Sequence, residues 1–192
     1  HKKVYEVAKE VLKKDNQDLN ALKQCLVALI NMDNYEEALA LIEKYKALIA
    51  RDSISDKLLL LERAYIYYKT NKGEELEKLI PLGENIRGFQ HVLAQYYYRF
   101  GESAKALKLY EQLLSSPEGE ESDLSVNKRA VQSQLKYQDS SRVISISGDD
   151  LEGSYDLMSN DALVKVREEK YDEALSLLKA ALSTAQENLK DY

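Results

Sequence analysis

Proline, glycine, cysteine and tryptophan are all scarce in this sequence. Its 192 residues include two Pro, seven Gly, one Cys and no Trp. So few turn-forming residues argue against a β-rich fold, which needs frequent tight turns. The single Cys25 cannot form an internal disulfide, so we expect a reducing compartment, the cytosol or the nucleus. No apolar run approaches the roughly 18 residues of a membrane helix, so no membrane insertion is expected.

Positive charge is also in the minority. The 27 Lys and Arg residues stand against 33 Asp and Glu residues, which gives a formal net charge of -6. A nucleic-acid-binding chain usually carries a basic excess or a basic patch with interleaved aromatic residues. The charge balance therefore argues against direct RNA binding by this chain.

The usual catalytic and metal-binding patterns are missing as well. Two His and one Cys cannot supply a conventional zinc site with closely spaced ligands, and there is no glycine-rich phosphate loop. Cys25 lies in an apolar helical stretch without an orienting base, which favours a packed core thiol over a nucleophile. His91 stands alone on a predicted helix and is interpreted as a surface or groove residue. We therefore expect no enzyme activity, no metal and no cofactor.

What the sequence does contain is an internal repeat. The segment Tyr35-Glu36-Glu37-Ala38-Leu39 recurs as Tyr171-Asp172-Glu173-Ala174-Leu175, and weaker copies place a small or apolar residue at Ala8, Leu76 and Ala106. The step from residue 38 to residue 106, and from there to residue 174, is 68 residues. That is twice the tetratricopeptide period of about 34 residues. Five copies in phase predict an array of helix pairs, with each copy opening the second helix of a pair.

Each predicted pair consists of two antiparallel helices joined by a short polar link. A small side chain at the repeat position lets the helices approach closely, since neither can bury its apolar face alone. The first copy, at Tyr5, lacks a preceding helix. The remaining predicted helices cover residues 22–30 with 38–45, 58–69 with 74–82, 89–100 with 102–114, 123–137, and 155–167 with 171–189.

These patterns predict an all-α fold, a right-handed solenoid of about ten helices in antiparallel pairs. We expect a single domain over residues 1–192, and a chain that is a fragment of a longer solenoid. Residues 138–154 interrupt the pattern, because their Ser, Gly and β-branched residues disfavour a long helix. We expect an irregular loop or a degenerate short helix there, with Ile144 or Ile146 against the core.

Tyrosines mark a candidate binding surface. Two predicted first helices each carry three tyrosines within four positions, and such neighbours span too wide an arc to face the core together. By repeat phase, Tyr67 and Tyr97 lie on the packed side, while Tyr68 and Tyr98 lie on the concave side with Tyr65 one turn earlier. These rings either pack at the rim of the core with their hydroxyls in water, or form an amphipathic floor for a bound peptide. Twelve residues share the concave side by phase, namely Lys23, Val27, Ile30, Tyr65, Tyr68, His91, Gln95, Tyr98, Arg99, Asn127, Val131 and Gln134.

The repeat pattern resembles the tetratricopeptide family over nearly the whole chain. It departs from that family where Leu22 and Leu26 replace aromatic and glycine positions, and where Leu76 replaces the small residue. Some family members bind the C-terminal carboxylate of chaperones with Lys and Asn one turn apart. Here Lys23 is followed by Val27, so the resemblance does not imply a co-chaperone role.

A more specific resemblance is to the tetratricopeptide region of the seventy-two-kilodalton subunits of the signal recognition particle. It is carried by residues 21–30, followed by 35–39, and by residues 62–72. The order of the units also fits, with an irregular fourth unit before a helix that contains Tyr155, Asn160 and Leu163.

The resemblance implies a scaffold in a cytoplasmic ribonucleoprotein that targets ribosomes to the endoplasmic reticulum, present also in the nucleus and nucleolus during assembly. It implies that the concave groove grips a segment of the sixty-eight-kilodalton subunit, and that RNA is contacted only through parts absent here. The rival interpretations are a generic adaptor or coat-type solenoid with an unrelated partner, and direct RNA binding. An exposed apolar end face could also pair two copies into a homodimer.

Overall fold

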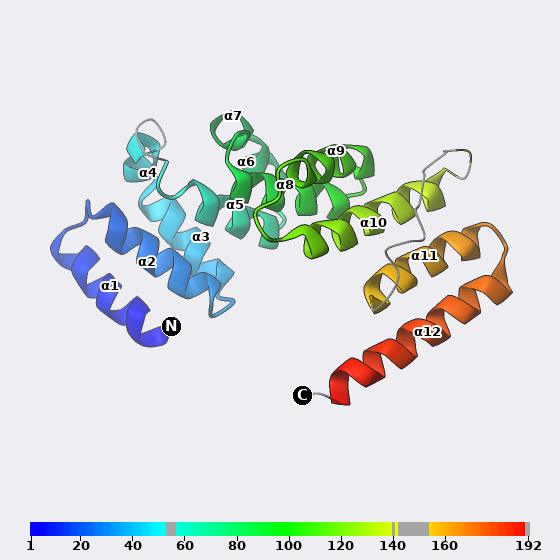
Figure 1. The fold of residues 1–192 in the computed structure, drawn as a ribbon. Helices are drawn as coiled ribbons and strands as arrows, with labels where there is room; N and C mark the ends of the chain where they lie inside the picture. Colours follow the sequence, from blue (N-terminus) through cyan, green and yellow to red (C-terminus); the bar gives the residue numbers. More distant parts are fainter. Residues whose placement is uncertain (53–56, 140, 142–153, 191–192) are drawn as a thin grey trace. The chain divides into compact units, whose positions relative to one another are not determined.

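The computed structural model describes residues 1–52, 57–139, 141 and 154–190, and among these residues it contains helices and no strand (Figure 1). The all-α prediction is therefore confirmed. In chain order the helices are α1 (Lys2–Lys14), α2 (Leu19–Ile30), α3 (Tyr35–Lys44), α4 (Lys46–Asp52), α5 (Leu60–Lys69), α6 (Gly73–Glu77), α7 (Ile80–Gly83), α8 (Arg87–Arg99), α9 (Ser103–Leu114), α10 (Glu121–Gln138), α11 (Tyr155–Arg167) and α12 (Tyr171–Lys190).

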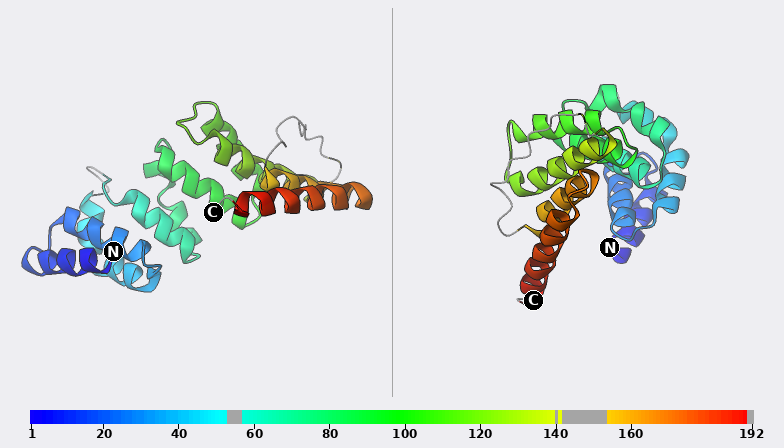
Figure 2. Two further views of the ribbon diagram at one scale, coloured as in Figure 1. Left: turned by 60° about the horizontal axis from the view of Figure 1, so that its bottom comes forward. Right: turned by 90° about the vertical axis from the view of Figure 1, so that its right-hand side faces the viewer.

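The helices form two compact units, His1–Leu93 and Ala94–Tyr192, and the division falls inside α8. Within each unit, helices that follow one another in the sequence pack together, as α1 with α2 and α9 with α10 do. The pairing is plainest for α11 and α12, which lie side by side and antiparallel in Figure 1 and stay next to each other in the views of Figure 2. Packing between sequence neighbours is the hallmark of repeat architectures. The single domain and the right-handed solenoid stay predictions.

The repeat position is buried in all five copies. Ala8, Ala38, Leu76, Ala106 and Ala174 are each at most a few per cent exposed. Small side chains at these points let the two helix backbones of a pair approach closely. Each helix then buries its apolar face against the other. The phase predicted from the repeat is therefore confirmed, including at Leu76, which is larger than its counterparts.

The link within four of the pairs has a common backbone geometry. One residue, five positions before the buried repeat position, has a positive φ, and these residues are Asp33 (53°), Asn71 (59°), Gly101 (79°) and Glu169 (61°). The next residue donates its backbone N–H to a carbonyl five residues back, for example Asn34 to Leu29 at 2.9 Å and Lys170 to Lys165 at 2.9 Å. This is the Schellman termination of a helix, which satisfies carbonyls that the helix end leaves free.

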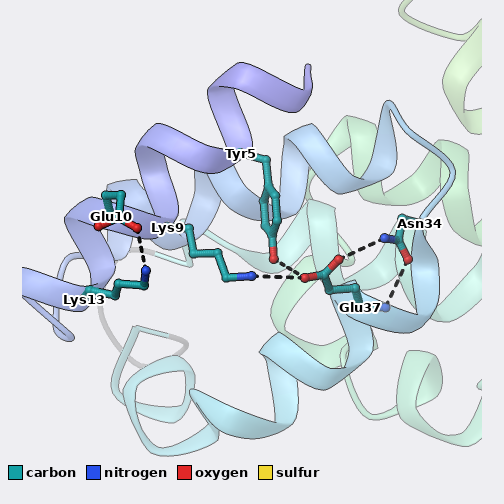
Figure 3. A network of polar contacts seen from close by, with 6 residues as sticks. All are labelled: Tyr5, Lys9, Glu10, Lys13, Asn34 and Glu37. Carbon is teal, nitrogen blue, oxygen red and sulfur yellow. Dashed lines mark hydrogen bonds and ion pairs between the residues drawn. The ribbon is translucent and has the colours of Figure 1, made fainter.

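A polar network ties α1 to α3 (Figure 3). The Tyr5 hydroxyl reaches from α1 and donates a hydrogen bond to the Glu37 carboxylate, and Lys9 Nζ lies 3.4 Å from the same oxygen. Asn34 caps α3 by accepting from the Glu37 backbone N–H, while its side-chain amide donates to the Glu37 carboxylate at 3.0 Å. Glu37 therefore organises both the start of α3 and its contact with α1.

Two differences from the predicted helices have local causes. The predicted helix over 74–82 is two short helices, α6 and α7, because Pro81 occupies the second position of α7. Proline has no N–H to bond to the preceding turn, so α6 cannot continue through it. A short helix, α4, also follows α3 after a break at Tyr45, which raises the number of helices in the described residues above the predicted ten.

The fourth unit departs from a simple pair. Its predicted first helix is present as α10, and α10 packs against both α9 and α11. The expectation for Ile144 and Ile146 in the 138–154 segment lies outside the described residues. A buried ion pair joins α10 to α11, with Arg129 Nε 2.7 Å from Asp161 Oδ1 and Arg129 Nη2 donating to Asp161 Oδ2 at 3.2 Å. Burial raises the pKa of Asp161, and the Arg129 guanidinium opposes that rise.

The positive-φ residue of the links gives a first prediction. A Cβ added at Gly101 would meet nothing within 4 Å, so replacement by alanine tests the backbone conformation alone. We expect Gly101→Ala to destabilise the fold by about 1 kcal/mol and Glu169→Gly to stabilise it by about the same amount. Urea unfolding followed by circular dichroism measures both. Equal midpoints for the two variants and the parent would contradict this account of the links.

The Glu37 network predicts a pH dependence. The hydrogen bond from Tyr5 is the main cause that lowers the pKa of Glu37, with Lys9 and Asn34 adding to it. A carboxyl group with a lowered pKa in the folded state contributes stability above its unfolded pKa of about 4.3. That contribution is lost as the pH falls through the folded value. Glu37→Gln should therefore show a shallower loss of stability between about pH 5 and pH 3, measured by thermal unfolding, than the parent.

The buried pair of Arg129 and Asp161 gives a third prediction. Asp161→Asn removes the buried carboxylate that faces the guanidinium and should cost about 3 kcal/mol, whereas Arg129→Met combined with Asp161→Leu should cost far less. Glu173→Gln is the matched control, because it removes an exposed ion pair in which Lys165 Nζ lies 2.8 Å from Glu173, worth under about 1 kcal/mol. Denaturant unfolding measures the loss of stability of each variant. An equal loss for Glu173→Gln and Asp161→Asn would show that burial does not make the Arg129–Asp161 pair more important than an exposed one.

Candidate partner-binding surface

The helical phase of α2 and α5 divides each helix into a buried face and a solvent-facing one. In α2 the residues Leu22, Leu26 and Leu29 are fully buried, whereas Lys23 and Val27, one position further on, remain partly exposed. Ile30 shares that partly exposed face. Because residues three and four apart share a helix face, these three predicted groove residues form one strip.

The same division in α5 places the tyrosines as predicted. Tyr67 is buried, while Tyr65 and Tyr68 are partly exposed. In α8, Tyr97 is buried and Tyr98 is 36% exposed. The prediction that Tyr67 and Tyr97 pack inside is therefore confirmed.

Three rings form a continuous aromatic surface in the first unit, which we call the tyrosine shelf (Tyr35, Tyr65 and Tyr68). The ring centroids of Tyr35 and Tyr65 are 6.5 Å apart and those of Tyr65 and Tyr68 are 6.2 Å apart, both pairs tilted. Tilted rings at this separation attract one another through the edge-to-face arrangement of their charge distributions. The shelf therefore has a fixed shape before any ligand arrives.

Polar contacts hold the edge of the shelf. The Tyr35 hydroxyl donates to Asp33 Oδ1 at 2.8 Å, and Asp33 is the positive-φ residue of the link before α3. Partial burial and this hydrogen bond raise the pKa of Tyr35, so its hydroxyl stays protonated. The ammonium group of Lys69 lies over two of the rings, 5.5 Å from the Tyr35 centroid and 5.8 Å from the Tyr65 centroid. Such cation–π contacts draw a positive charge onto the aromatic surface.

An ion pair links α2 to α5 beside the shelf. Lys23 Nζ lies 3.5 Å from Glu62 Oε1, and the Glu62 side chain is only 10% exposed. The partner of the predicted groove residue Lys23 is therefore a carboxylate of the same unit. Removing the counter-ion of a buried carboxylate strongly destabilises a fold, because the charge is then left buried and unpaired. Lys23 has a structural role in addition to any contact with a ligand.

The other predicted groove residues lie on α8 and α10. His91 is partly exposed in the first unit, and Gln95, Tyr98 and Arg99 are exposed in the second. The Arg99 guanidinium lies 5.9 Å from the centroid of the Phe100 ring.

On α10, Asn127 is partly exposed, and Gln134 Oε1 already accepts a hydrogen bond from Ser103 Oγ at 2.8 Å. Val131 is 0% exposed. It belongs to the core, so its assignment to the ligand-facing side is wrong. The cause is the added contact of α10 with both α9 and α11, which covers a face that the repeat phase alone leaves open.

Three residues of this surface were absent from the sequence-based set, namely Tyr35, Leu61 and Lys69. Leu61 is 41% exposed and lies four residues before Tyr65 and seven before Tyr68, so helical spacing alone could have identified it. Tyr35 and Lys69 join the surface through ring contacts between α3 and α5. No spacing within one helix reveals such contacts.

The sequence also predicted that Cys25 is a packed core thiol. Cys25 is a buried thiol, and burial raises its pKa, in accord with a packed core residue rather than an activated nucleophile. Within the part of the chain that the structure describes, no three His, Cys, Asp or Glu side chains gather into a possible metal site. Nor is any described helix long and apolar enough to cross a membrane.

Comparison with known proteins places these features in a family. The model of the SRP TPR-like family, described as a TPR-like repeat, matches residues 3–134. The signal recognition particle subunit SRP72 of Caenorhabditis elegans is 27% identical over 194 residues, which cover 100% of this chain and 29% of that protein. The subunit srp72 of Schizosaccharomyces pombe is 29% identical over 159 residues, which cover 83% of this chain and 25% of that protein. The chain thus spans less than a third of either relative.

Proposed function

The chain belongs to the SRP TPR-like family, and from this premise we propose that it is the partner-binding part of a signal recognition particle subunit. Its partner is a segment of another subunit of the particle, the sixty-eight-kilodalton subunit, held on the exposed faces of the first helices. Through this grip the chain supports targeting of ribosomes to the endoplasmic reticulum from the cytoplasm. Two relatives named as signal recognition particle subunits support the proposal.

The observation that carries the proposal is the tyrosine shelf. Its rings are packed against each other and yet partly exposed. Tyrosine is favoured at protein interfaces, because it combines a large contact area with a hydroxyl and has few rotatable bonds. A surface already held in shape by ring contacts and by the Lys23–Glu62 ion pair loses little entropy on binding.

The charge of the chain favours a protein partner over RNA. With a formal net charge of -6, the chain as a whole repels a polyanion, and several of its lysines lie beside carboxylates, as Lys9 does beside Glu37 and Lys78 beside Glu75. Counter-ion release, which drives nucleic-acid binding, requires cations that are free to contact phosphates. RNA contact in the particle therefore falls to other parts of the subunit.

Substitution of groove tyrosines tests the proposal. Tyr68→Ala combined with Tyr98→Ala should weaken binding of the sixty-eight-kilodalton subunit by about tenfold or more, since truncation of an aromatic contact at an interface commonly costs over 1 kcal/mol. Isothermal titration with the recombinant subunit measures the affinity, and circular dichroism checks that helix content is retained. Tyr137→Ala is the matched control, because Tyr137 is 53% exposed but lies outside the predicted groove set.

The outcomes separate the proposal from its rival. Equal affinity for the double variant and the parent would show that the groove tyrosines do not bind the partner. If the parent fails to bind the subunit but recovers coat proteins in a pull-down from cytosol, the chain is an adaptor with an unrelated partner.

A further inference from the structure

The Lys69 ammonium is positioned on the tyrosine shelf without a carboxylate partner among the described residues. It lies over the faces of Tyr35 and Tyr65, whereas Lys23, on the neighbouring helix, is neutralised by Glu62. Ring faces orient an ammonium group but do not cancel its charge. We propose that Lys69 binds a carboxylate of the partner segment, and that a large apolar side chain of the same segment packs on Leu61, Tyr65 and Tyr68. This deepens the proposed function and rests on it.

Two acidic groups of the same unit, Asp33 and Glu62, are occupied in other contacts. Asp33 accepts the hydrogen bond of the Tyr35 hydroxyl, and Glu62 faces Lys23 from the adjacent side of α5. Lys69 is the last residue of α5, where the helix carbonyls offer a partial negative charge, equivalent to about half an electron for the whole helix end. A full carboxylate from a ligand would complement the ammonium more strongly, because charge-assisted hydrogen bonds are roughly twice as strong as neutral ones.

The apolar half of the site lies along α5. Leu61, Tyr65 and Tyr68 follow one another at intervals of four and three residues and therefore share a face of the helix. Gly88 of α8 lies next to Leu61, and a Cβ at Gly88 would lie 3.1 Å from Leu61 Cδ2. With no side chain on Gly88, Leu61 keeps 41% of its surface exposed. This surface and the two rings together offer a floor for an aliphatic or aromatic side chain.

The geometry fixes the spacing that a ligand needs. Leu61 and Lys69 are eight positions apart, which is about 12 Å along a helix axis, but the Lys69 ammonium lies over the Tyr65 ring, 5.8 Å from its centroid, and Tyr65 is only about 6 Å from Leu61 along the axis. A carboxylate at the ammonium therefore lies about 6 to 12 Å from the apolar floor, which an extended peptide covers in about two to four residues. The preferred ligand is therefore an extended segment with an Asp or Glu two to four residues from a Leu, Ile, Met, Phe or Trp.

Peptide selection tests this without assuming the identity of the partner. The probe is a displayed library of random twelve-residue peptides, selected in parallel on the parent chain, on Lys69→Met and on Lys72→Met. Lys72→Met is the matched control, since Lys72 is an exposed lysine three residues away at the start of α6. We expect peptides enriched on the parent and on Lys72→Met to show the acidic-apolar spacing, and those enriched on Lys69→Met to lose the acidic residue but keep the apolar one.

The result that overturns the inference is equally specific. It is overturned by a parent selection that yields no binders, by binders without acidic enrichment, or by acidic enrichment that survives Lys69→Met. A single-stranded twelve-nucleotide RNA forms a separate arm. The inference fails if that RNA binds the parent, binds Lys69→Met more weakly, and displaces the selected peptides. The Lys69 ammonium would then bind a phosphate and not a carboxylate.

A second measurement separates this inference from the proposed function. Against the recombinant sixty-eight-kilodalton subunit, Lys69→Glu should bind about tenfold more weakly than the parent, with Lys69→Met in between. Failure of the subunit to bind even the parent would refute the proposed function, while the peptide selection would still decide the role of Lys69. Equal affinity for the parent, Lys69→Met and Lys69→Glu would refute the carboxylate contact alone.

Discussion

Close contact between the two helices of a pair is the constraint on which the rest of the structure depends. A helix of ten to fourteen residues is marginal in water by itself and gains most of its stability by burying an apolar face against a neighbour. Ala38, Ala106 and Ala174 are buried where their helices meet a partner, and a small side chain there keeps the backbones close. Leu76 occupies the same place fully buried, but there the second helix ends within five residues and a second short helix follows. The pair tolerates the larger residue together with a shorter helix.

This contact also decides which residues are left for binding. Once the repeat position faces the partner helix, the helical period assigns each of the residues of α2 and α5 either to the core or to the surface. The Schellman links reinforce the assignment, since a positive φ at Asp33, Asn71, Gly101 or Glu169 fixes how the chain leaves one helix and enters the next. Asp33 has a second role, because its carboxylate anchors the Tyr35 hydroxyl at the edge of the tyrosine shelf. The backbone turn that ends one helix therefore also orients a side chain of the candidate site.

Much of the fold could be predicted from the sequence, because the repeat supplies both spacing and phase. The predicted bounds of α9, α10 and α11 lie within two residues of the observed ones, and Tyr67 and Tyr97 are buried as their phase requires. The failures arise where a local or tertiary effect outweighs the period. Pro81 divides a predicted helix through its missing N–H, and Val131 is buried because α10 has neighbours on two sides. Tyr65 and Tyr68 of the shelf were predicted, but Tyr35 was not, since the contacts of Tyr35 and Lys69 join different helices and follow no spacing in one helix.

An acidic chain that selects an acidic ligand is no contradiction, because distance decides which charges matter. At physiological ionic strength, charges separated by more than about 8 Å are largely screened, so the net charge of -6 slows the approach of an acidic segment without deciding its bound position. In the bound position the nearest charges govern the energy. There the Lys69 ammonium lies over the rings of Tyr35 and Tyr65, and the Asp33 carboxylate is engaged with the Tyr35 hydroxyl. Recognition under these conditions disfavours long polyanions, which the whole chain repels along their length, and favours a short segment with one well-placed carboxylate. Such a ligand places a single charge beside the Lys69 ammonium and relies on apolar contact with Leu61, Tyr65 and Tyr68 for the remainder of its affinity.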